Sequence, residues 1–299
     1  MCSRPATTDR GLLPNQHDLA GRGGPWEPPP LFNRRPHGAP FPVVLPRRAR
    51  HRCPSGIGEA IARRLAERGH GVILVARRAD ALRTLAAELR EQHGVRAEAL
   101  ACDLTDASAR ERLASEVDGL GLEVSVLVNN AGFGTYAPFA ESPRDRELEQ
   151  VRINTEAVVD LTSRHLPAML RRGEGAVLVT ASTAAFQPLP GNAVYAASKA
   201  FALSFAEALH REAGPKGVAV TALCPGPVKT GFQDASAAHD FAATLPRPLW
   251  RSADQVAEAA LRGLERGRRV VVPGSTNRIV AAAGRFSPRP VVLRVMDQT

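Results

Sequence analysis

The stretch that decides the fold is RHRCPSGIGEAIARRLAERGHGVILVARR, residues 50–78. Gly56 and Gly58 lead into a segment whose apolar residues recur at helical spacing, so a helix is expected over 57–68. The apolar run GVILVA (71–76) follows a short glycine-bounded turn and is typical of a strand buried on both faces of a parallel sheet. This order of elements predicts a dinucleotide-binding unit, in which a helix N-terminus binds the pyrophosphate.

Strands and helices alternate along the rest of the chain. Strand–helix alternation with short loops predicts a single α/β domain with a Rossmann-like, doubly wound parallel sheet in three layers, α/β/α. Ligands in such a fold bind at the carboxyl ends of the strands. The expected strands are 96–101, 124–129, 175–182, 218–223 and 269–273, and the expected helices are 79–93, 106–118, 144–172, 193–213 and 253–266.

The first 50 residues differ in composition from everything after them. They hold ten of the 24 prolines and few apolar clusters, so they cannot bury enough surface to offset their ordering entropy. We expect a disordered Pro/Arg-rich tail at 1–50, a Rossmann-fold domain at 51–275 and a basic amphipathic extension at 276–299. That extension could touch a membrane surface, but we favour packing on the domain or on a neighbouring subunit.

The composition excludes several classes of protein. Of the formal net charge of +9, +5 lies in residues 1–50, which hold eight arginines and three acidic residues. No basic stripe or stacking motif accompanies this charge, so nucleic acid is not an expected partner. The four cysteines lack metal-ligand spacing and suggest no disulfide framework, which favours a reducing compartment and no metal site. With no apolar run of membrane-spanning length and no apolar signal core at the N-terminus, the sequence indicates a cytoplasmic protein.

Two positions after predicted strands bear on the choice of cofactor. Arg77 follows the 71–76 strand, where sites that prefer NAD(H) carry an acidic residue for the ribose hydroxyls. A guanidinium suits a 2′-phosphate, so we expect NADP(H) rather than NAD(H), with the adjacent Arg78 as a solvated helix start. Asp103 and Leu104 follow the next strand, where a carboxylate could accept the adenine amino group. Alternatively, Asp103 caps the 106–118 helix, a role that Thr105 could also take.

Ser182, Tyr195 and Lys199 form the most specific constellation in the sequence. Tyr195 and Lys199 lie four residues apart within a predicted helix and therefore share one face. A phenol has a pKa near 10 and is a poor base, but a neighbouring ammonium favours the phenolate and lowers that pKa. Ser182 ends a predicted strand, where its hydroxyl could bind a substrate oxygen. The alternative is a surface lysine and a half-buried tyrosine on one helix.

NNAG (129–132), Ser182, YAASK (195–199) and PGPVKT (225–230) together resemble the short-chain dehydrogenase/reductase family, over residues 51 to about 273. The resemblance implies that Tyr195 is the general acid/base and that Lys199 lowers its pKa and binds the nicotinamide ribose. It implies further that Ser182 stabilises the substrate carbonyl or alcohol, and that Asn154 holds a water for proton relay, unless Asn154 only makes a helix hydrogen bond. It also implies a homodimer or homotetramer formed through the 144–172 and 193–213 helices. The other residues that it places at the cofactor are Ser55, Gly56, Ile57, Gly58, Asn130, Ala131, Gly132, Pro225, Gly226 and Thr230.

The sequence departs from the family at its N-terminal signature, Thr-Gly-x-x-x-Gly-x-Gly. His51 and Arg52 stand where Thr and the first Gly belong, and LPRRAR (45–50) stands where a buried apolar strand should lie. Burying arginines there would cost several kcal/mol each. If the arginines of residues 47–53 are encoded by CGN codons, the same DNA read one base forward permits Ala-Ala-Leu-Val-Thr-Gly-Ala. We therefore hypothesise that residues up to about 53 are a frame-shifted reading. If they are genuine, Val43–Leu45 would be a makeshift strand and cofactor affinity should be poor.

Residues 231–250 lie where members of this family close over substrate. The aromatic residues of this segment and of neighbouring loops suggest an apolar pocket, although core packing is an alternative for each. We therefore expect an NADP(H)-dependent oxidoreductase that interconverts a lipophilic alcohol and its ketone or aldehyde. A non-catalytic relative with an impaired cofactor loop is the alternative, and the intact Ser182–Tyr195–Lys199 set favours the enzyme. The aromatic residues are Phe133, Tyr136, Phe186, Phe232, Phe241 and Trp250.

Overall fold

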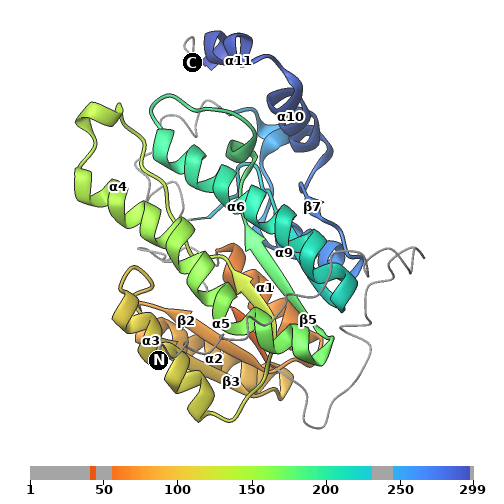
Figure 1. Cartoon of the computed structure of the whole chain (residues 1–299). Helices are drawn as coiled ribbons and strands as arrows, with labels where there is room; N and C mark the ends of the chain where they lie inside the picture. Colours follow the sequence, from red (N-terminus) through yellow and green to blue (C-terminus); the bar gives the residue numbers. More distant parts are fainter. Residues whose placement is uncertain (1–40, 45–55, 231–244, 297–299) are drawn as a thin grey trace, which may run out of the picture.

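The computed structural model describes residues 41–44, 56–230 and 245–296 (Figure 1). Within them, parallel strands form one sheet in the order β3-β2-β1-β4-β5-β6-β7. The order reverses between β1 and β4, which is where doubly wound folds open a ligand-binding crevice. This confirms the predicted single-domain α/β Rossmann-like fold. The strands are β1 (Phe41–Val44), β2 (Val72–Ala76), β3 (Ala97–Ala101), β4 (Val124–Asn129), β5 (Gly175–Thr180), β6 (Val218–Leu223) and β7 (Val270–Val271).

Strand β1 comes from the segment that we expected to be disordered, and for Phe41–Val44 that expectation is wrong. Val43 pairs with Ile73 of β2 and with Leu127 of β4, at the centre of the sheet. An apolar FPVV segment can occupy this position, whereas the arginines of 45–50 could not be buried there without a large desolvation cost. The strand thus lies near the makeshift Val43–Leu45 strand that we anticipated for a genuine sequence. Residues 1–40 and 45–55 lie outside the described part, and the coding hypothesis stays a prediction.

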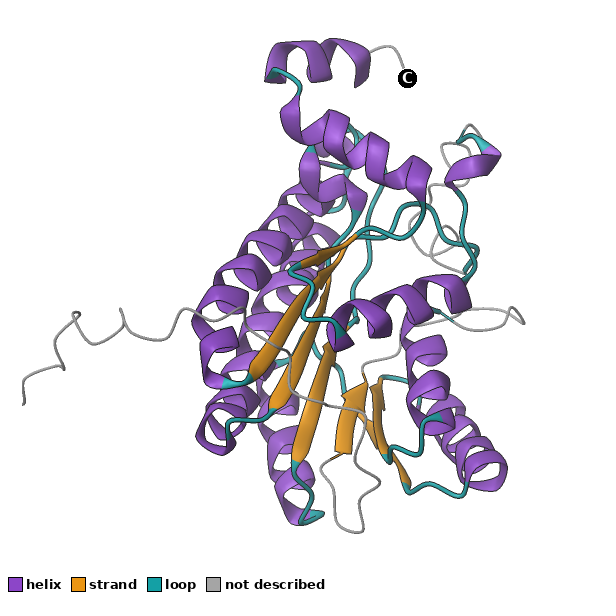
Figure 2. Ribbon diagram, turned by 90° about the vertical axis from the view of Figure 1, so that its right-hand side faces the viewer, coloured by secondary structure: helices purple, strands orange, loops and turns teal. Residues whose placement is uncertain are grey.

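Helices cover both faces of the sheet (Figure 2). Along β2, Ile73 and Val75 belong to the core cluster on the side of α3, α5 and α6, whereas Val72 and Leu74 belong to the cluster beneath α1, α2 and α9. This alternation explains why the strand is apolar throughout, since each side chain enters one of two cores. The helices of these two layers are α1 (Ile57–Glu67), α2 (Ala79–His93), α3 (Ala107–Gly119), α5 (Ala157–Arg172), α6 (Ala193–Ala213) and α9 (Ala253–Glu265).

The predicted 144–172 helix is interrupted by a π-helical turn. Helix α4 (Arg144–Val151) runs into the turn Arg152–Glu156, and α5 continues directly from it. A π-turn adds a residue to the helix and rotates the side chains beyond it, which is common at functional sites. Here the turn carries Asn154.

Two further helices, α10 (Ser275–Phe286) and α11 (Arg289–Met296), complete the described chain. Asn277, Ala281 and Gly284 form the buried face of α10. The 276–299 segment is therefore not wholly separate from the domain, because one face of its first helix packs on that domain as we favoured.

Candidate active site

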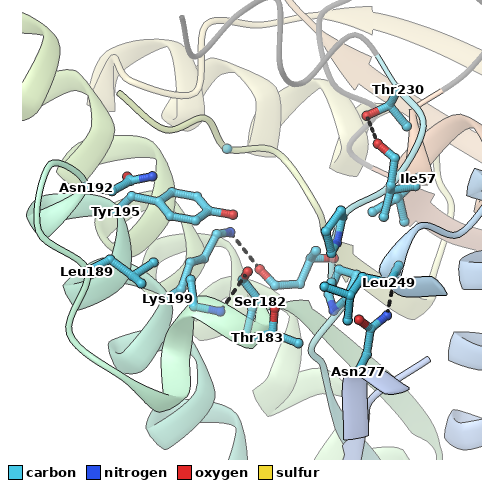
Figure 3. Close-up of a pocket in the computed structure, with 18 of the residues that line it drawn as sticks. Ile57, Ser182, Thr183, Leu189, Asn192, Tyr195, Lys199, Thr230, Leu249 and Asn277 are labelled. Carbon is cyan, nitrogen blue, oxygen red and sulfur yellow. Dashed lines mark hydrogen bonds between the residues drawn. The ribbon is translucent and has the colours of Figure 1, made fainter. Parts of the chain in front are cut away.

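A cavity of about 270 Å³ opens at the carboxyl ends of β4, β5 and β6 (Figure 3). This is the edge of the sheet at which the fold predicts a ligand. The predicted site residues that line it are Gly56, Ile57, Asn130, Gly132, Ser182, Tyr195, Lys199, Pro225, Gly226 and Thr230.

Tyr195 and Lys199 lie near the start of α6 and both line the cavity. The Lys199 side chain is buried, and its Nζ donates a hydrogen bond of 2.8 Å to the Thr180 carbonyl at the end of β5. The same Nζ lies 5.8 Å from the centroid of the Tyr195 ring. A buried ammonium is retained only where polar partners compensate for lost water. The Thr180 carbonyl therefore holds this charge beside the phenol, as the helical spacing predicted.

Ser182 follows β5 and caps the 3-10 turn Thr183–Phe186. Its Oγ accepts a hydrogen bond of 3.1 Å from the Ala184 amide. A hydroxyl carries one donor besides its acceptor lone pairs, so this bond leaves the Ser182 proton able to point into the cavity. A hydrogen bond from Ser182 to a substrate oxygen is compatible with this geometry and stays a prediction.

Asn154 is almost fully buried in the π-turn and lies behind the cavity wall rather than among the lining residues. Its Nδ2 donates to the Phe133 carbonyl and to Ser198 Oγ, both at 2.9 Å, and its Oδ1 accepts from the Phe133 amide at 3.2 Å. A Cβ on Gly132 would come within 2.4 Å of that Oδ1. Glycine at 132 therefore allows the amide to support the loop that follows β4. The alternative that Asn154 only makes a hydrogen bond within its own helix is wrong, because its bonds join the π-turn to the loop after β4 and to α6.

The cofactor residues predicted at the ends of β2 and β3 lie together. Arg77 Nη1 is 3.6 Å from a carboxylate oxygen of Asp103. Partial burial would raise the pKa of Asp103, but hydrogen bonds from the amide and hydroxyl of Thr105, aided by the Arg77 charge, hold that pKa below its ordinary value. The capping alternative is wrong for both Asp103 and Thr105, because Asp106 caps α3 by accepting from the Ser108 amide at 2.8 Å.

The other predicted cofactor residues that the structure describes lie at α1 and directly after β3 and β4. Gly56 is the N-cap of α1 and has no side chain to occupy the amides of the first turn, so that helix end can receive an anion. Leu104 is buried after β3, and Ala131 is half-buried after β4. Gly58 is buried within α1, and Ser55 lies outside the described residues. With Arg77 at the end of β2, this donor set fits a phosphorylated dinucleotide.

Asn277 of α10 lines the cavity and was not anticipated from the sequence. Its Nδ2 donates to the carbonyls of Leu249 and Pro273 at 3.0 and 2.9 Å, and its Oδ1 would lie 2.4 Å from a Cβ on Gly226. Gly226 therefore admits an α10 side chain against the PGP segment. No local motif marks Asn277, because its role depends on α10 folding back over residues distant in sequence.

The predicted aromatic pocket is wrong for the four of its residues that the structure describes. Phe133, Tyr136, Phe186 and Trp250 are not among the cavity-lining residues; Phe133 and Phe186 are buried core residues, and Trp250 donates to the Leu245 carbonyl. The core-packing alternative therefore holds for the two phenylalanines. Phe232 and Phe241 lie outside the described residues. Among the described residues, the aliphatic side chains that line the cavity include Ile57, Leu189, Val228, Leu245, Leu249 and Val280.

Two further observations concern only the described part of the chain. It contains no cluster of His, Cys, Asp and Glu side chains able to hold a metal ion. None of its helices combines the length and apolarity needed to cross a bilayer.

Comparison with known proteins places these features in context. The sequence profile of the short chain dehydrogenase family matches residues 53–240. The very-long-chain 3-oxoacyl-CoA reductase of Anas platyrhynchos is 38% identical over 181 residues, which cover 58% of this chain and 57% of that protein. The 1-deoxy-11-beta-hydroxypentalenate dehydrogenase of Streptomyces exfoliatus is 41% identical over 180 residues, covering 59% and 65%. The chain thus spans about three fifths of the length of these curated relatives.

Solved structures match over more of the chain. A short-chain dehydrogenase from Sphingobium yanoikuyae in complex with NADPH is similar with a TM-score of 0.71 and 30% identity, covering 87% of this chain and 96% of that one. The bulky-bulky ketone specific alcohol dehydrogenase from Comamonas testosteroni is similar with a TM-score of 0.68 and 25% identity, covering 88% and 95%.

Proposed function

This chain belongs to the short-chain dehydrogenase family, and from that premise we propose that it is an NADP(H)-dependent oxidoreductase that interconverts a lipophilic alcohol and its ketone or aldehyde. The observation that carries this proposal is that Ser182, Tyr195 and Lys199 line one cavity, with the Lys199 ammonium buried beside the phenol.

Each of these three side chains has a distinct task in the proposed reaction. Bound NADP(H) supplies or accepts the hydride. In the reductive direction the Tyr195 hydroxyl gives its proton to the substrate oxygen, and in the oxidative direction it takes that proton back. The Lys199 charge favours the phenolate form, and it would also hold the nicotinamide ribose. Ser182 donates a hydrogen bond to the substrate oxygen and so fixes the carbonyl beside Tyr195.

The choice of NADP(H) rests on charge at the end of β2. Arg77 stands where a carboxylate would otherwise meet the ribose hydroxyls, and its guanidinium can make paired hydrogen bonds to a 2′-phosphate. The Sphingobium relative was solved with NADPH, which agrees with this choice. Asp103 keeps its negative charge and remains available to the adenine amino group.

A lipophilic substrate suits the cavity lining. Leu189, Leu245, Leu249 and Val280 line the same cavity as Ser182 and Tyr195. Such a pocket orients a ligand through one polar point and binds the remainder by burying apolar surface. Relatives named for very-long-chain 3-oxoacyl-CoA and for bulky ketones support the same class.

We also propose that the protein forms a homodimer or homotetramer in the cytoplasm. Val151 on α4, Val159 on α5 and Phe201 on α6 are exposed, and pairing these helices with a second copy would bury them. Cys102 and Cys224 are free thiols within the described chain, which agrees with a reducing compartment.

Two measurements test the proposed enzyme. NADPH fluorescence titration of the folded protein should show saturable binding, and a panel of lipophilic ketones followed at the NADPH absorbance should include one that is turned over. The chain has two tyrosines, which supply a matched pair of variants. Tyr195→Phe should lower turnover by about a hundredfold or more and spare NADPH binding, whereas Tyr136→Phe should change neither. Folded protein without NADPH binding would instead favour the non-catalytic alternative, and retained turnover in Tyr195→Phe would refute the assignment of the acid/base.

A further inference from the structure

Apolar surface is concentrated at the C-terminal end of the molecule. Of the nine large hydrophobic side chains that are exposed among the described residues, five lie on α10 and α11: Ile279, Val280, Phe286, Val291 and Leu293. Both helices lie beyond the carboxyl ends of the strands, at the end of the molecule that holds the cavity (Figures 1 and 2). A patch of this kind on a soluble domain usually marks an interaction site.

Helix α10 has its larger apolar side chains on its exposed face rather than on the face that packs on the domain. Its buried face is small and partly polar, formed by Asn277, Ala281 and Gly284. Its exposed side carries an apolar stripe at helical spacing, Ile279–Ala282–Ala283–Phe286. Phe286 is 79% and Ile279 is 70% exposed. The larger apolar residues therefore face away from the domain, opposite to the arrangement of an ordinary surface helix.

Positive charge surrounds this stripe. Residues 275–296 contain four arginines and no acidic residue, and all four guanidinium-bearing residues are exposed. Arg285 lies 3.9 Å from Glu207, which is a loose contact. A second protein copy would have to supply acidic groups around an apolar groove, whereas an anionic phospholipid surface offers both negative charge and a place for apolar side chains. The arginines are Arg278, Arg285, Arg289 and Arg294.

We propose that α10 and α11 dock this protein on an anionic phospholipid surface, with Ile279 and Phe286 inserted at the level of the acyl chains. Val280 both lines the catalytic cavity and is exposed beside this stripe. The docked orientation therefore puts the cavity next to the lipid. That the membrane supplies the lipophilic substrate rests on the proposed function; the docking itself does not.

The docking surface is tested by co-sedimentation of the full chain with vesicles. One set contains phosphatidylcholine alone and the other contains equal parts of phosphatidylcholine and phosphatidylglycerol. The protein should partition onto the anionic set. Phe286→Ser should weaken this partition at least about tenfold, because it removes the burial of an aromatic side chain. Arg278→Ala should weaken this partition about fivefold, because each arginine near an anionic surface contributes about 1 kcal/mol.

Matched controls separate docking from general stickiness and from catalysis. Phe139→Ser removes another exposed phenylalanine outside α10 and α11, and Arg144→Ala removes another exposed arginine; neither should alter partition. Tyr195→Phe should partition like the wild type even when turnover is lost, so the two proposals fail separately. Partition that is unaffected by Phe286→Ser, or absence of anionic-vesicle binding, would overturn the docking surface. Self-association that Phe286→Ser abolishes, without vesicle binding, would assign the surface to a second copy instead.

Discussion

Replacement of Gly132 by alanine tests how tightly the site is built. A Cβ at this position would lie 2.4 Å from Asn154 Oδ1 and 3.4 Å from Lys199 Nζ. The first distance is far inside van der Waals contact, so the Asn154 amide must move. Its hydrogen bonds to the backbone of Phe133 and to Ser198 hold a buried side chain and would be distorted together.

The size of the effect follows from those contacts. Overpacking a dense interior costs about 1–3 kcal/mol, and one weakened buried hydrogen bond adds about 1 kcal/mol. Gly132→Ala should therefore lower the free energy of unfolding by about 2–4 kcal/mol. For a domain of this size the corresponding fall in melting temperature is about 4–16 °C. Turnover should fall as well, because the displaced Asn154 side chain bonds to Ser198, which directly precedes Lys199.

Gly119→Ala supplies the matched control. Gly119 ends α3, and a Cβ there would have no heavy atom within 4 Å. The same substitution should be neutral or stabilise the protein by up to about 1 kcal/mol through helix propensity. Thermal and denaturant unfolding of both variants measure the difference. A Gly132→Ala protein as stable and as active as Gly119→Ala would refute the close approach of Asn154.

Three further predictions concern charge and burial. Arg110→Met should destabilise the fold by about 2–3 kcal/mol at neutral pH, because the buried guanidinium bonds to Asp160 and a second acid. Burial would raise the pKa of Asp160, but hydrogen bonds from Arg110 and another arginine hold it below its ordinary value. The stability that the ionised Asp160 carboxylate contributes is therefore fully present above its unfolded pKa of about 4, and it is lost as pH falls through its lower folded pKa. Denaturant unfolding measured against pH should show a smaller loss of stability in Arg110→Met than in the wild type. Fluorescence titration should show that Arg77→Ala weakens NADPH binding about ten- to a hundredfold and leaves NADH binding unchanged. The same titration should show no change in either affinity for Arg78→Ala, because Arg78 is exposed. Burial raises the pKa of Cys224 to about 12, so iodoacetamide at neutral pH should leave it unmodified in native protein and alkylate it only in denaturant, by mass spectrometry.

The sheet and the catalytic trio could be predicted because their signals are local. A strand such as β2 is buried on both faces and must be apolar throughout, and Tyr195 and Lys199 share a helix face by their spacing alone. The helices that cover the sheet could likewise be predicted from the helical spacing of their apolar residues. These features depend on neighbours within about one helical turn or one strand.

Other features depend on contacts between distant segments. The central strand begins at Phe41 because it must pair with both β2 and β4, a requirement absent from the local pattern of a proline-rich stretch. The π-turn at Arg152–Glu156 places Asn154 against Gly132. The hydrophobic periodicity of the sequence does not indicate the one residue that this turn adds to the helix. Asn277 reaches the cavity only because α10 packs back over Gly226.

The central claim is that a buried ammonium and a phenol on α6 act together on a substrate beside a bound nicotinamide. A crystal structure of the protein with NADP⁺ tests it most directly. We predict the nicotinamide ribose within hydrogen-bond distance of Lys199 Nζ, with the Tyr195 hydroxyl facing the adjoining open space. A dinucleotide bound elsewhere, or a Lys199 amine remote from both the ribose and the Tyr195 ring, would contradict the account.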